Sequence, residues 1–378
     1  MYIEIHTVEE LIPHLKRKTL QCLVVQGLDL RALSSELLQC PGTGSAFLGC
    51  QLQERIRDHL QQSGALIFPS LDNLPYRPFR PRLYSIEELM GGYVRGQVES
   101  FYTETLDSRI YRHYTAARGG KSTPILETLA QRLHDHAIDD ALSDLLIDGE
   151  TERRVVGVMG GHAMRRDEET YRIVARVAWR LARSGLFVTT GGGPGAMEAA
   201  NLGAWMSRWS EAELDEAVSM LAFAPKYDHP GWFDAAFMVR DRWHDGVESL
   251  AIPTWFYGHE PSNLFSTHIA KYFANSLRED GLLALATWGI VFAPGSAGTI
   301  QEIFQDAAQN HYGTFKVISP MVFLGRTYWT EERPVYPLLR QLAEGRKYHR
   351  MITISDDLDE IVTFIENNPP VPFADQAS

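Results

Sequence analysis

The sequence predicts an α/β protein built on a doubly wound, Rossmann-like parallel sheet. From about Arg153 onward, short apolar runs bounded by glycine or proline alternate with segments of helical period, an alternation typical of βαβ units. Three of the apolar runs pass directly into glycine-containing turns, as strands do where they lead into helices. We therefore predict a Rossmann-like domain over residues 151–378, preceded by a smaller α+β domain over residues 1–150.

The elements of the larger domain follow from these patterns. Strands are predicted at residues 155–159, 186–190, 250–256, 289–293, 321–324 and 351–354. Between the first two strands, the apolar residues from Ile173 to Ala182 fall on one helical stripe, which can pack on the sheet. Further helices, each flanked by turn residues, are predicted at residues 201–207, 234–243, 267–277, 300–311, 335–343 and 358–366.

The smaller domain carries fewer signals. A strand is predicted within each of the segments 22–30, 44–52 and 64–70. Residues 118–124 are predicted to form a linker, and the apolar residues from Leu126 to Leu146 beyond it follow a helical period. No motif in residues 1–150 indicates a chemical activity.

Composition excludes several classes of partner. With 36 Lys plus Arg against 48 Asp plus Glu, the formal net charge is −12 and no basic patch stands out, so we expect binding neither to nucleic acid nor to acidic membranes. The N-terminus lacks the pattern of a secretion signal, and no apolar run approaches the ~20 residues that span a bilayer. The three cysteines, at positions 22, 40 and 50, show no paired spacing and are typical of reduced thiols. A cytoplasmic protein is predicted.

Three strand-to-helix turns are the strongest functional signal. Backbone N–H groups and the positive end of a helix dipole converge at such turns, and glycine lets a phosphate or ribose come close. At the carboxyl ends of parallel strands the turns would face one crevice, although tight turns without a ligand remain the alternative. The candidate binding residues are Gly160, Gly161, His162, Gly191, Gly192, Gly193, Gly195, Gly295, Ser296, Ala297, Gly298 and Thr299.

Neither nucleotide fingerprint fits these turns. None of the three turns has the Gly-Lys-Ser/Thr ending of a P-loop, and none reads G-x-G-x-x-G with an acid ~20 residues later. A site for a single phosphate remains, with Thr299 as a hydroxyl donor. The histidines His244, His259, His268 and His311 show no metal-binding spacing, so we predict neither a metal nor another cofactor.

The runs TTGGGPGAMEAANLGA and PGSAGTIQE resemble the paired motifs of the Lonely Guy (LOG) phosphoribohydrolases and the related pyrimidine/purine nucleotide 5′-monophosphate nucleosidases. The family's second motif reads P-G-G-x-G-T-x-x-E, and Ser296 replaces its second glycine. VMGGHAMRRDEETY is similar to the first turn of the nucleosidase branch, and HEPSNLF resembles the segment in which a Glu and an Asn precede the catalytic Arg. The resemblance covers about residues 153–312.

The resemblance implies hydrolysis of the N-glycosidic bond of a nucleoside 5′-monophosphate to free base and ribose 5-phosphate. By the match, Glu302 is the catalytic glutamate and Arg278 the counterpart of the arginine. Arg278 lies one residue farther from Pro294 than the family pattern expects, which leaves Arg240 or Arg242 as alternatives. Family members are commonly dimers or larger, so a homo-oligomer is expected, while the base preference stays open.

Structural explanations compete with each assignment. Thr299 to Glu302 form a capping-box sequence, in which the glutamate would only bond the helix N-terminus. Glu198 can bind ribose hydroxyls or favour its helix by the dipole, and Asn263 can contact ligand or order a loop. Aromatic residues between 232 and 273 can line a base pocket or fill the core. Two rival functions are a non-catalytic nucleotide or phosphate-cofactor binding protein, acting as sensor or carrier, and a ribosyl transferase.

Overall fold

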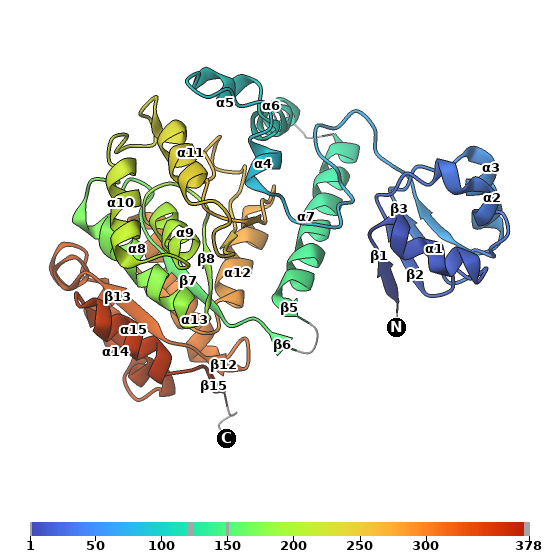
Figure 1. Cartoon of the computed structure of the whole chain (residues 1–378). Coiled ribbons are helices and arrows are strands. Elements are labelled where there is room, and N and C mark those ends of the chain that lie inside the picture. Colours follow the sequence, from blue (N-terminus) through green and yellow to red (C-terminus); the bar gives the residue numbers. More distant parts are fainter. Residues whose placement is uncertain (1, 119–123, 149–150, 374–378) are drawn as a thin grey trace. The chain divides into compact units, whose positions relative to one another are not determined.

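The computed structural model describes residues 2–118, 124–148 and 151–373 and divides into two compact units (Figure 1). The first unit is Met1–Leu83 with Arg112–Leu145, and the second is Tyr84–Tyr111 with Leu146–Ser378. The chain therefore passes three times between the units, whereas a single boundary was predicted near residue 150. Of the predicted linker, residues 119–123 lie outside the described part of the chain.

The second unit contains the predicted doubly wound sheet. Its seven strands run in the order β10-β9-β8-β7-β11-β13-β14, and every pairing is parallel. The strands are β7 (Val155–Met159), β8 (Phe187–Thr190), β9 (Leu250–Ala251), β10 (His268–Ile269), β11 (Ile290–Phe292), β13 (Met321–Leu324) and β14 (Ile352–Ser355). The strand order reverses between β7 and β11, which is the topological switch point of the sheet.

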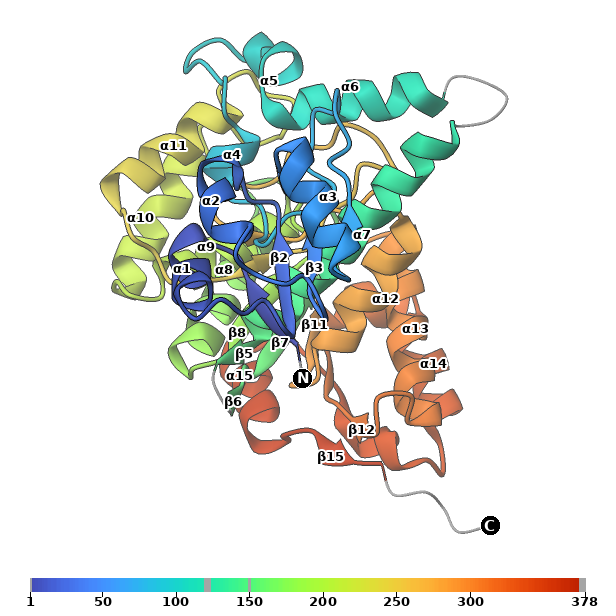
Figure 2. The ribbon, with the colours of Figure 1, turned by 90° about the vertical axis from the view of Figure 1, so that its right-hand side faces the viewer.

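Helices cover both faces of this sheet, as Figures 1 and 2 show. One face carries α8 (Glu169–Arg183), α9 (Ala196–Met206) and α15 (Leu358–Asn367), and the other carries α12 (Asn275–Leu285), α13 (Ala297–Tyr312) and α14 (Val335–Ala343). The predicted stripe of the first helix is confirmed, because Val174, Val177, Ala178 and Leu181 are all buried. The remaining elements are α4 (Ile86–Leu89), α5 (Glu99–Thr103), α6 (Leu106–Arg118), α10 (Glu211–Leu221), α11 (Trp232–Arg242), β5 (Ile147–Asp148), β6 (Thr151–Glu152), β12 (Val317–Ile318), β15 (Val371–Pro372), the π-helical turn Tyr328–Glu332 and the 3-10 turn Lys347–Met351.

Two predictions for this unit are wrong. The strand expected at 250–256 stops at Ala251, because Pro253 cannot donate a ladder hydrogen bond. The helix expected at 267–277 is instead the edge strand β10 followed by a turn, and α12 begins only at Asn275. Four apolar residues of that segment are buried beside the sheet edge: Ile269, Ala270, Tyr272 and Phe273. The helix α10 was not predicted, although Ser210 and Glu213 form a complete capping box at its start.

The first unit has a parallel sheet of its own, with strands β1 (Ile3–Ile5), β2 (Leu23–Gln26), β3 (Ala46–Leu48) and β4 (Leu66–Phe68) in sequential order. The strands are connected by the helices α1 (Val8–Lys16), α2 (Ser34–Leu37) and α3 (Glu54–Gln62) and by the 3-10 turn Arg31–Leu33. The helix predicted from Leu126 to Leu146 is α7 (Ile125–Leu146). The three predicted strands are confirmed. Because strands alternate with helices in a parallel sheet, this part is α/β rather than α+β.

No helix in the described residues is both long and apolar enough to cross a membrane.

Candidate active site

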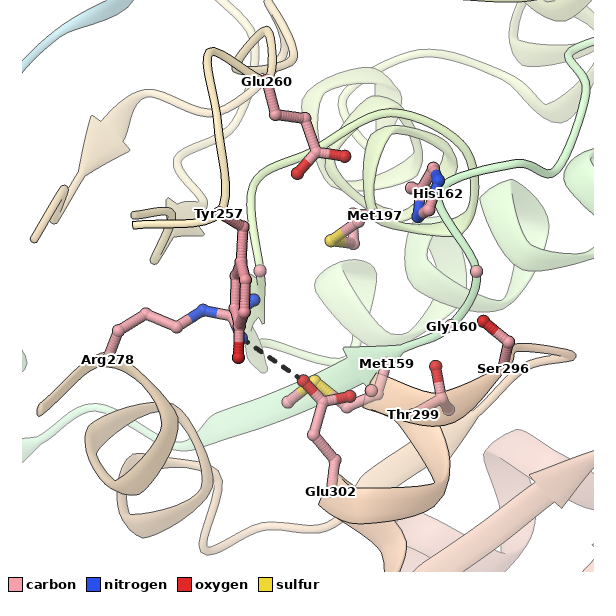
Figure 3. A pocket seen from close by; sticks show the side chains of 13 residues that line it. Met159, Gly160, His162, Met197, Tyr257, Glu260, Arg278, Ser296, Thr299 and Glu302 are labelled. Carbon is pink, nitrogen blue, oxygen red and sulfur yellow. Dashed lines mark ion pairs between the residues drawn. The ribbon is translucent and has the colours of Figure 1, made fainter. Parts of the chain in front are cut away.

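A cavity of about 160 Å³ lies at the switch point of the larger sheet, where Met159 ends β7 (Figure 3). Open α/β sheets bind ligands in this place, because the loops diverge there and leave a crevice. Its wall combines residues from all three glycine turns with residues from α12, α13 and the segment after β9. The lining residues are Met159, Gly160, Gly161, His162, Gly191, Met197, Tyr257, Glu260, Arg278, Ser296, Gly298, Thr299 and Glu302.

The three glycine turns interlock at this cavity. The Gly161 amide donates to the Pro294 carbonyl (2.9 Å), and the Gly161 carbonyl accepts from the Ala196 amide (3.2 Å). A Cβ on Gly160 would lie 2.6 Å from that of Ala196, and a Cβ on Gly195, whose φ is +70°, would collide with the Gly161 carbonyl. The glycines are therefore required by the close approach of one turn to the next.

The third turn presents the N-terminus of α13 to the cavity. The helix begins at Ala297, and Ser296 stands at the N-cap position without a side-chain cap. The first amides of a helix have no intrahelical acceptor, so these N–H groups and the helix dipole favour an anion here. The predicted capping box is wrong, since Thr299 is the third helical residue and Glu302 lies in the second turn. Capping therefore cannot explain Glu302.

Glu302 and Arg278 meet on the floor of the cavity. Their side chains are 13% and 14% exposed, and Arg278 Nη1 lies 3.7 Å from Glu302 Oε1. Arg278 also donates from Nε to the Ile252 carbonyl (2.9 Å), and the missing side chain of Gly191 leaves room for its guanidinium. Burial raises the pKa of Glu302 to about 7, against the lowering effect of Arg278.

The alternative arginines are engaged elsewhere. Arg240 bonds the Leu264 carbonyl and Glu87 and lies over the Trp205 ring, while Arg242 pairs with Glu216 at 2.7 Å. Neither lines the cavity, so the geometry brings only Arg278 of the three to Glu302.

Several predicted binding residues support the turns instead of lining the cavity. Glu198 is fully buried and forms a two-pronged ion pair with Arg166 (2.8 and 2.5 Å), so its carboxylate is occupied. Asn263 is also buried: its amide N–H donates to the Gly192 carbonyl (2.8 Å), and its side chain donates to the Gly193 carbonyl (3.3 Å). The others outside the lining are Gly192, Gly193, Gly195, Gly295 and Ala297. Gly195 and Glu198 border a neighbouring cavity of about 240 Å³ that shares His162.

Four lining residues were not among the predicted site residues. Glu260 carries a second carboxylate, which points into the cavity from the wall opposite Glu302 in Figure 3. Tyr257 stands beside Arg278 and donates from its hydroxyl to Glu279 Oε1 (2.9 Å). The HEPSNLF resemblance and the dense aromatic residues were usable signals for these two, whereas no sequence signal indicates Met159 or Met197.

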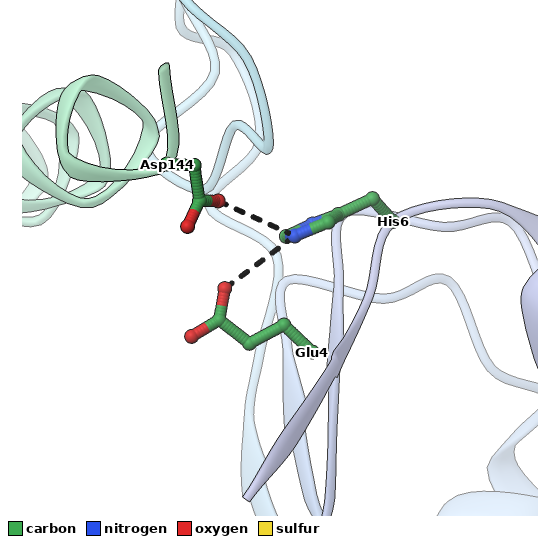
Figure 4. A group of neighbouring side chains, drawn as sticks. All are labelled: Glu4, His6 and Asp144. Atoms are coloured by element: carbon green, nitrogen blue, oxygen red, sulfur yellow. Dashed lines mark ion pairs between the residues drawn. The ribbon is translucent and has the colours of Figure 1, made fainter. Parts of the chain in front are cut away.

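A cluster of possible metal ligands lies in the other unit. His6 Nε2 is 3.4 Å from a Glu4 oxygen and 3.8 Å from an Asp144 oxygen (Figure 4). Both carboxylates are exposed, and burial together with Asp140 and Asp144 raises the pKa of Glu4. A histidine bridging two repelling carboxylates accounts for this group without a metal ion.

The fold defines an α/β protein of the Rossmann-like class with a cavity at the switch point of its larger sheet. Residues 153–208 match the family model described as the SLOG cluster4 family, a part of the LOG-like superfamily. This match bears out the resemblance of the glycine motifs in these residues to the LOG-like superfamily. Among curated proteins, none matches the chain.

Solved structures match part of the chain at low identity. They include the molybdenum cofactor binding protein of the phototrophic bacterium Rippkaea orientalis (13% identity, TM-score 0.37, 58% of this chain and 98% of that one). The Moco carrier protein of Chlamydomonas reinhardtii has 15% identity and a TM-score of 0.36 over 57% of this chain and 97% of that one. The protein TM1055 has 19% identity and a TM-score of 0.35 over 56% and 98%. Similarities this distant do not indicate a ligand.

One helical turn beyond Glu302, Asp306 is buried without lining the cavity, and its Oδ2 has no hydrogen-bond partner among the described residues. Burial raises its pKa to about 8. Because an exposed Asp in the unfolded chain ionises near pH 4, the folded state holds one more proton than the unfolded state between about pH 4 and 8. Stability from this group is full below pH 4 and is lost as pH rises through that window.

The Asp306→Asn variant lacks this loss, so we expect its melting temperature to gain on that of the wild type as pH increases from 5 to 8.5. The gain should correspond to at least about 1 kcal/mol. Thermal unfolding followed by circular dichroism at four pH values measures it, with the exposed Glu331→Gln as control. Parallel melting profiles for wild type and Asp306→Asn would contradict a buried, protonated Asp306.

Proposed function

We propose that this protein hydrolyses the N-glycosidic bond of nucleoside 5′-monophosphates and releases the free base and ribose 5-phosphate. The observation that carries the proposal is the buried Glu302 carboxylate beside Arg278, close to the N-terminus of α13 in one cavity. Such a cavity offers an anion site and a carboxylate of raised pKa within one small volume. The family match over residues 153–208 is compatible with the proposal.

The 5′-phosphate binds at the start of α13. The first amides of the helix, with the hydroxyls of Ser296 and Thr299, supply donors for its oxygens, and Gly298 lets them approach. Charge-assisted hydrogen bonds of this kind are roughly twice as strong as neutral ones. The phosphate thereby directs the ribose toward Glu302, which lies one helical turn further along.

Glu302 acts on the anomeric carbon. Cleavage of the C1′–N bond leaves its electron pair on the base and builds positive charge on the ribose, which a nearby carboxylate stabilises. Water then bonds to C1′ and Glu302 takes the proton that this water loses. Glu302 returns that proton to the departing base, which restores the carboxylate. A pKa of about 7 suits a group that accepts and returns a proton near neutral pH. Arg278 keeps its charge throughout and opposes protonation of Glu302.

The phosphate site predicts that AMP binds at least ten times more tightly than adenosine, because adenosine leaves the α13 amides without an anion. Isothermal titration calorimetry with wild type at low ionic strength measures both constants. Thr299→Val, which removes one hydroxyl donor and keeps the side-chain shape, should weaken AMP and leave adenosine unchanged. Equal affinities for AMP and adenosine would remove the phosphate from the proposal.

Glu302→Gln should lower turnover of nucleoside monophosphates by roughly 10²-fold or more, because an amide neither accepts a proton nor stabilises a cation. In the wild type, kcat/KM should rise with pH through about 7, the pKa of Glu302, and this limb should vanish in the variant. Asp306→Asn is the matched control, since it replaces a buried carboxyl group of the same helix that does not line the cavity. Release of ribose 5-phosphate across a panel of nucleotides measures both effects and gives the base preference.

The same assay separates the rival functions. Tight nucleotide binding without turnover would favour a sensor or carrier, and label exchange from added free base into nucleotide would favour a ribosyl transferase. Wild-type turnover in Glu302→Gln would contradict the catalytic assignment while leaving the fold and the phosphate site intact.

We further propose a homo-oligomer. Ile303 and Ala307 of α13 are buried within the single chain, so an interface must use other surfaces, such as the exposed Tyr312, Leu338 and Leu342 of α13 and α14. Light scattering at micromolar concentration should give a multiple of 42.7 kDa. A clean mass of one chain would contradict the proposal.

A further inference from the structure

The segment between β9 and β10 carries two cavity residues, Tyr257 and Glu260, yet has no regular structure beyond an isolated bridge between Thr254 and Tyr272. Glu260 is exposed and forms no hydrogen bond or ion pair with any described residue. Its position in the cavity therefore depends on what fixes the backbone on either side of it.

That backbone is fixed through one buried carboxylate, Asp107 of α6. Asp107 Oδ1 accepts from the Trp255 indole N–H (2.8 Å) and from Lys271 Nζ (2.7 Å), and Oδ2 contacts His259 Nε2 (3.2 Å). Lys271 also reaches Ser262 Oγ (3.4 Å). Trp255 and His259, which contact Asp107, and Ser262, which contacts Lys271, all belong to the segment. They flank Glu260 on both sides in the sequence.

The cluster is nearly dry. Asp107 and Lys271 are 2% and 1% exposed, and although burial works to raise it, Lys271 and His259 lower the pKa of Asp107 to about 2. The carboxylate is thus ionised at any physiological pH, and its bonds to Lys271 and His259 are strengthened by the low local dielectric.

His259, the direct neighbour of Glu260, is also clamped between two rings. It stacks on Phe101 with centroids 4.5 Å apart and planes within 1°, and on Tyr111 at 5.2 Å and 12°. Phe101, Asp107 and Tyr111 all come from the stretch Tyr84–Tyr111, which belongs to the same compact unit as the cavity. This stretch therefore holds His259 through its contact with the Asp107 carboxylate and through ring stacking on Phe101 and Tyr111.

We propose that Asp107 is a positioning residue that holds Glu260 in the cavity, where the Glu260 carboxylate accepts a hydrogen bond from a donor group of the substrate. A carboxylate without a protein partner at a cavity wall offers only acceptors, so it selects ligands that present O–H or N–H groups. The inference rests on the proposed nucleotide substrate, which presents such donors as ribose hydroxyls and, in adenine, as an exocyclic amine.

The test is a double-mutant cycle on Asp107→Asn and Glu260→Gln, with dissociation constants measured by calorimetry. Each single variant should weaken AMP about tenfold or more, and Asp107→Asn should cost little further once Glu260 is Gln. Asp215→Asn is the matched control, because it removes the bonds from Arg172 and Arg176 between α8 and α10, away from the segment. Additive effects of the two substitutions would overturn the positioning role, and unchanged affinity in Glu260→Gln would overturn the acceptor role.

Two analogues separate the sources of the donor. If ribose hydroxyls meet Glu260, then Glu260→Gln abolishes the preference for AMP over 2′,3′-dideoxy-AMP. If the exocyclic amine does, the variant abolishes the preference for AMP over IMP. Preferences that persist in both comparisons would overturn the contact between Glu260 and the substrate.

A readout without ligand keeps this inference separate from the proposed function. Asp107→Asn should speed amide hydrogen exchange over residues 256–262 by tenfold or more, whereas Asp215→Asn should not. His259→Gln, which keeps Asp107 paired with Lys271, should give a smaller increase and serves if Asp107→Asn does not fold. Failure of the wild type to bind any nucleotide would contradict the proposed function. Unchanged rates of amide hydrogen exchange in both Asp107→Asn and His259→Gln would contradict the positioning role.

Discussion

The close approach of three backbone turns at the switch point is the constraint on which the rest of the structure depends. Gly161 bonds to the turn after β11 through its amide and to the start of α9 through its carbonyl. Such contacts need backbones nearly touching, and a methyl group on Gly160 or Gly195 would prevent them. The glycines thereby fix the N-terminus of α13 and the floor of the cavity relative to β7.

This arrangement would bring two negative charges close together, that of a bound phosphate and that of the Glu302 carboxylate. In the proposed function, a phosphate at the start of α13 would lie one turn from Glu302, and the two negative charges would repel each other in a small cavity. Arg278 offsets part of the negative charge, because it comes from another helix and pairs with Glu302. Burial nevertheless dominates, so the pKa of Glu302 stays raised. A carboxylate that is half-ionised near neutral pH can share the cavity with phosphate at lower cost than a fully charged one.

The sequence predicted the elements whose conformation depends on neighbouring residues along the chain. The predictions were wrong where contacts with distant residues determine the structure or the role of a side chain. Strands β7 and β8 and the glycine turns after them carry local signals, and each lies within a residue or two of its prediction. The segment 267–277 was misread because its burial depends on pairing with β9, not on its own helical period. Glu198 was assigned to ligand because nothing nearby indicates that Arg166, 32 residues away, occupies its carboxylate. The start of α13 at Ala297 overturned the capping box, since the turn geometry and not the Thr-x-x-Glu spacing sets the N-cap.

The cluster around Asp107 is the extreme case, because no local pattern links α6 to the segment after β9, 148 residues later. Its presence is not explained by stability. Removing a carboxylate and an ammonium group from water costs several kcal/mol per ion, and their attraction often does no more than offset that cost. What a buried ion cluster adds over an apolar contact is direction, because Asp107 must meet Trp255, His259 and Lys271 at fixed angles to be satisfied. The irregular segment has no helix or strand hydrogen bonds to hold Glu260 at the cavity. An apolar contact would leave its backbone free to shift, whereas the oriented bonds to Asp107 restrict it.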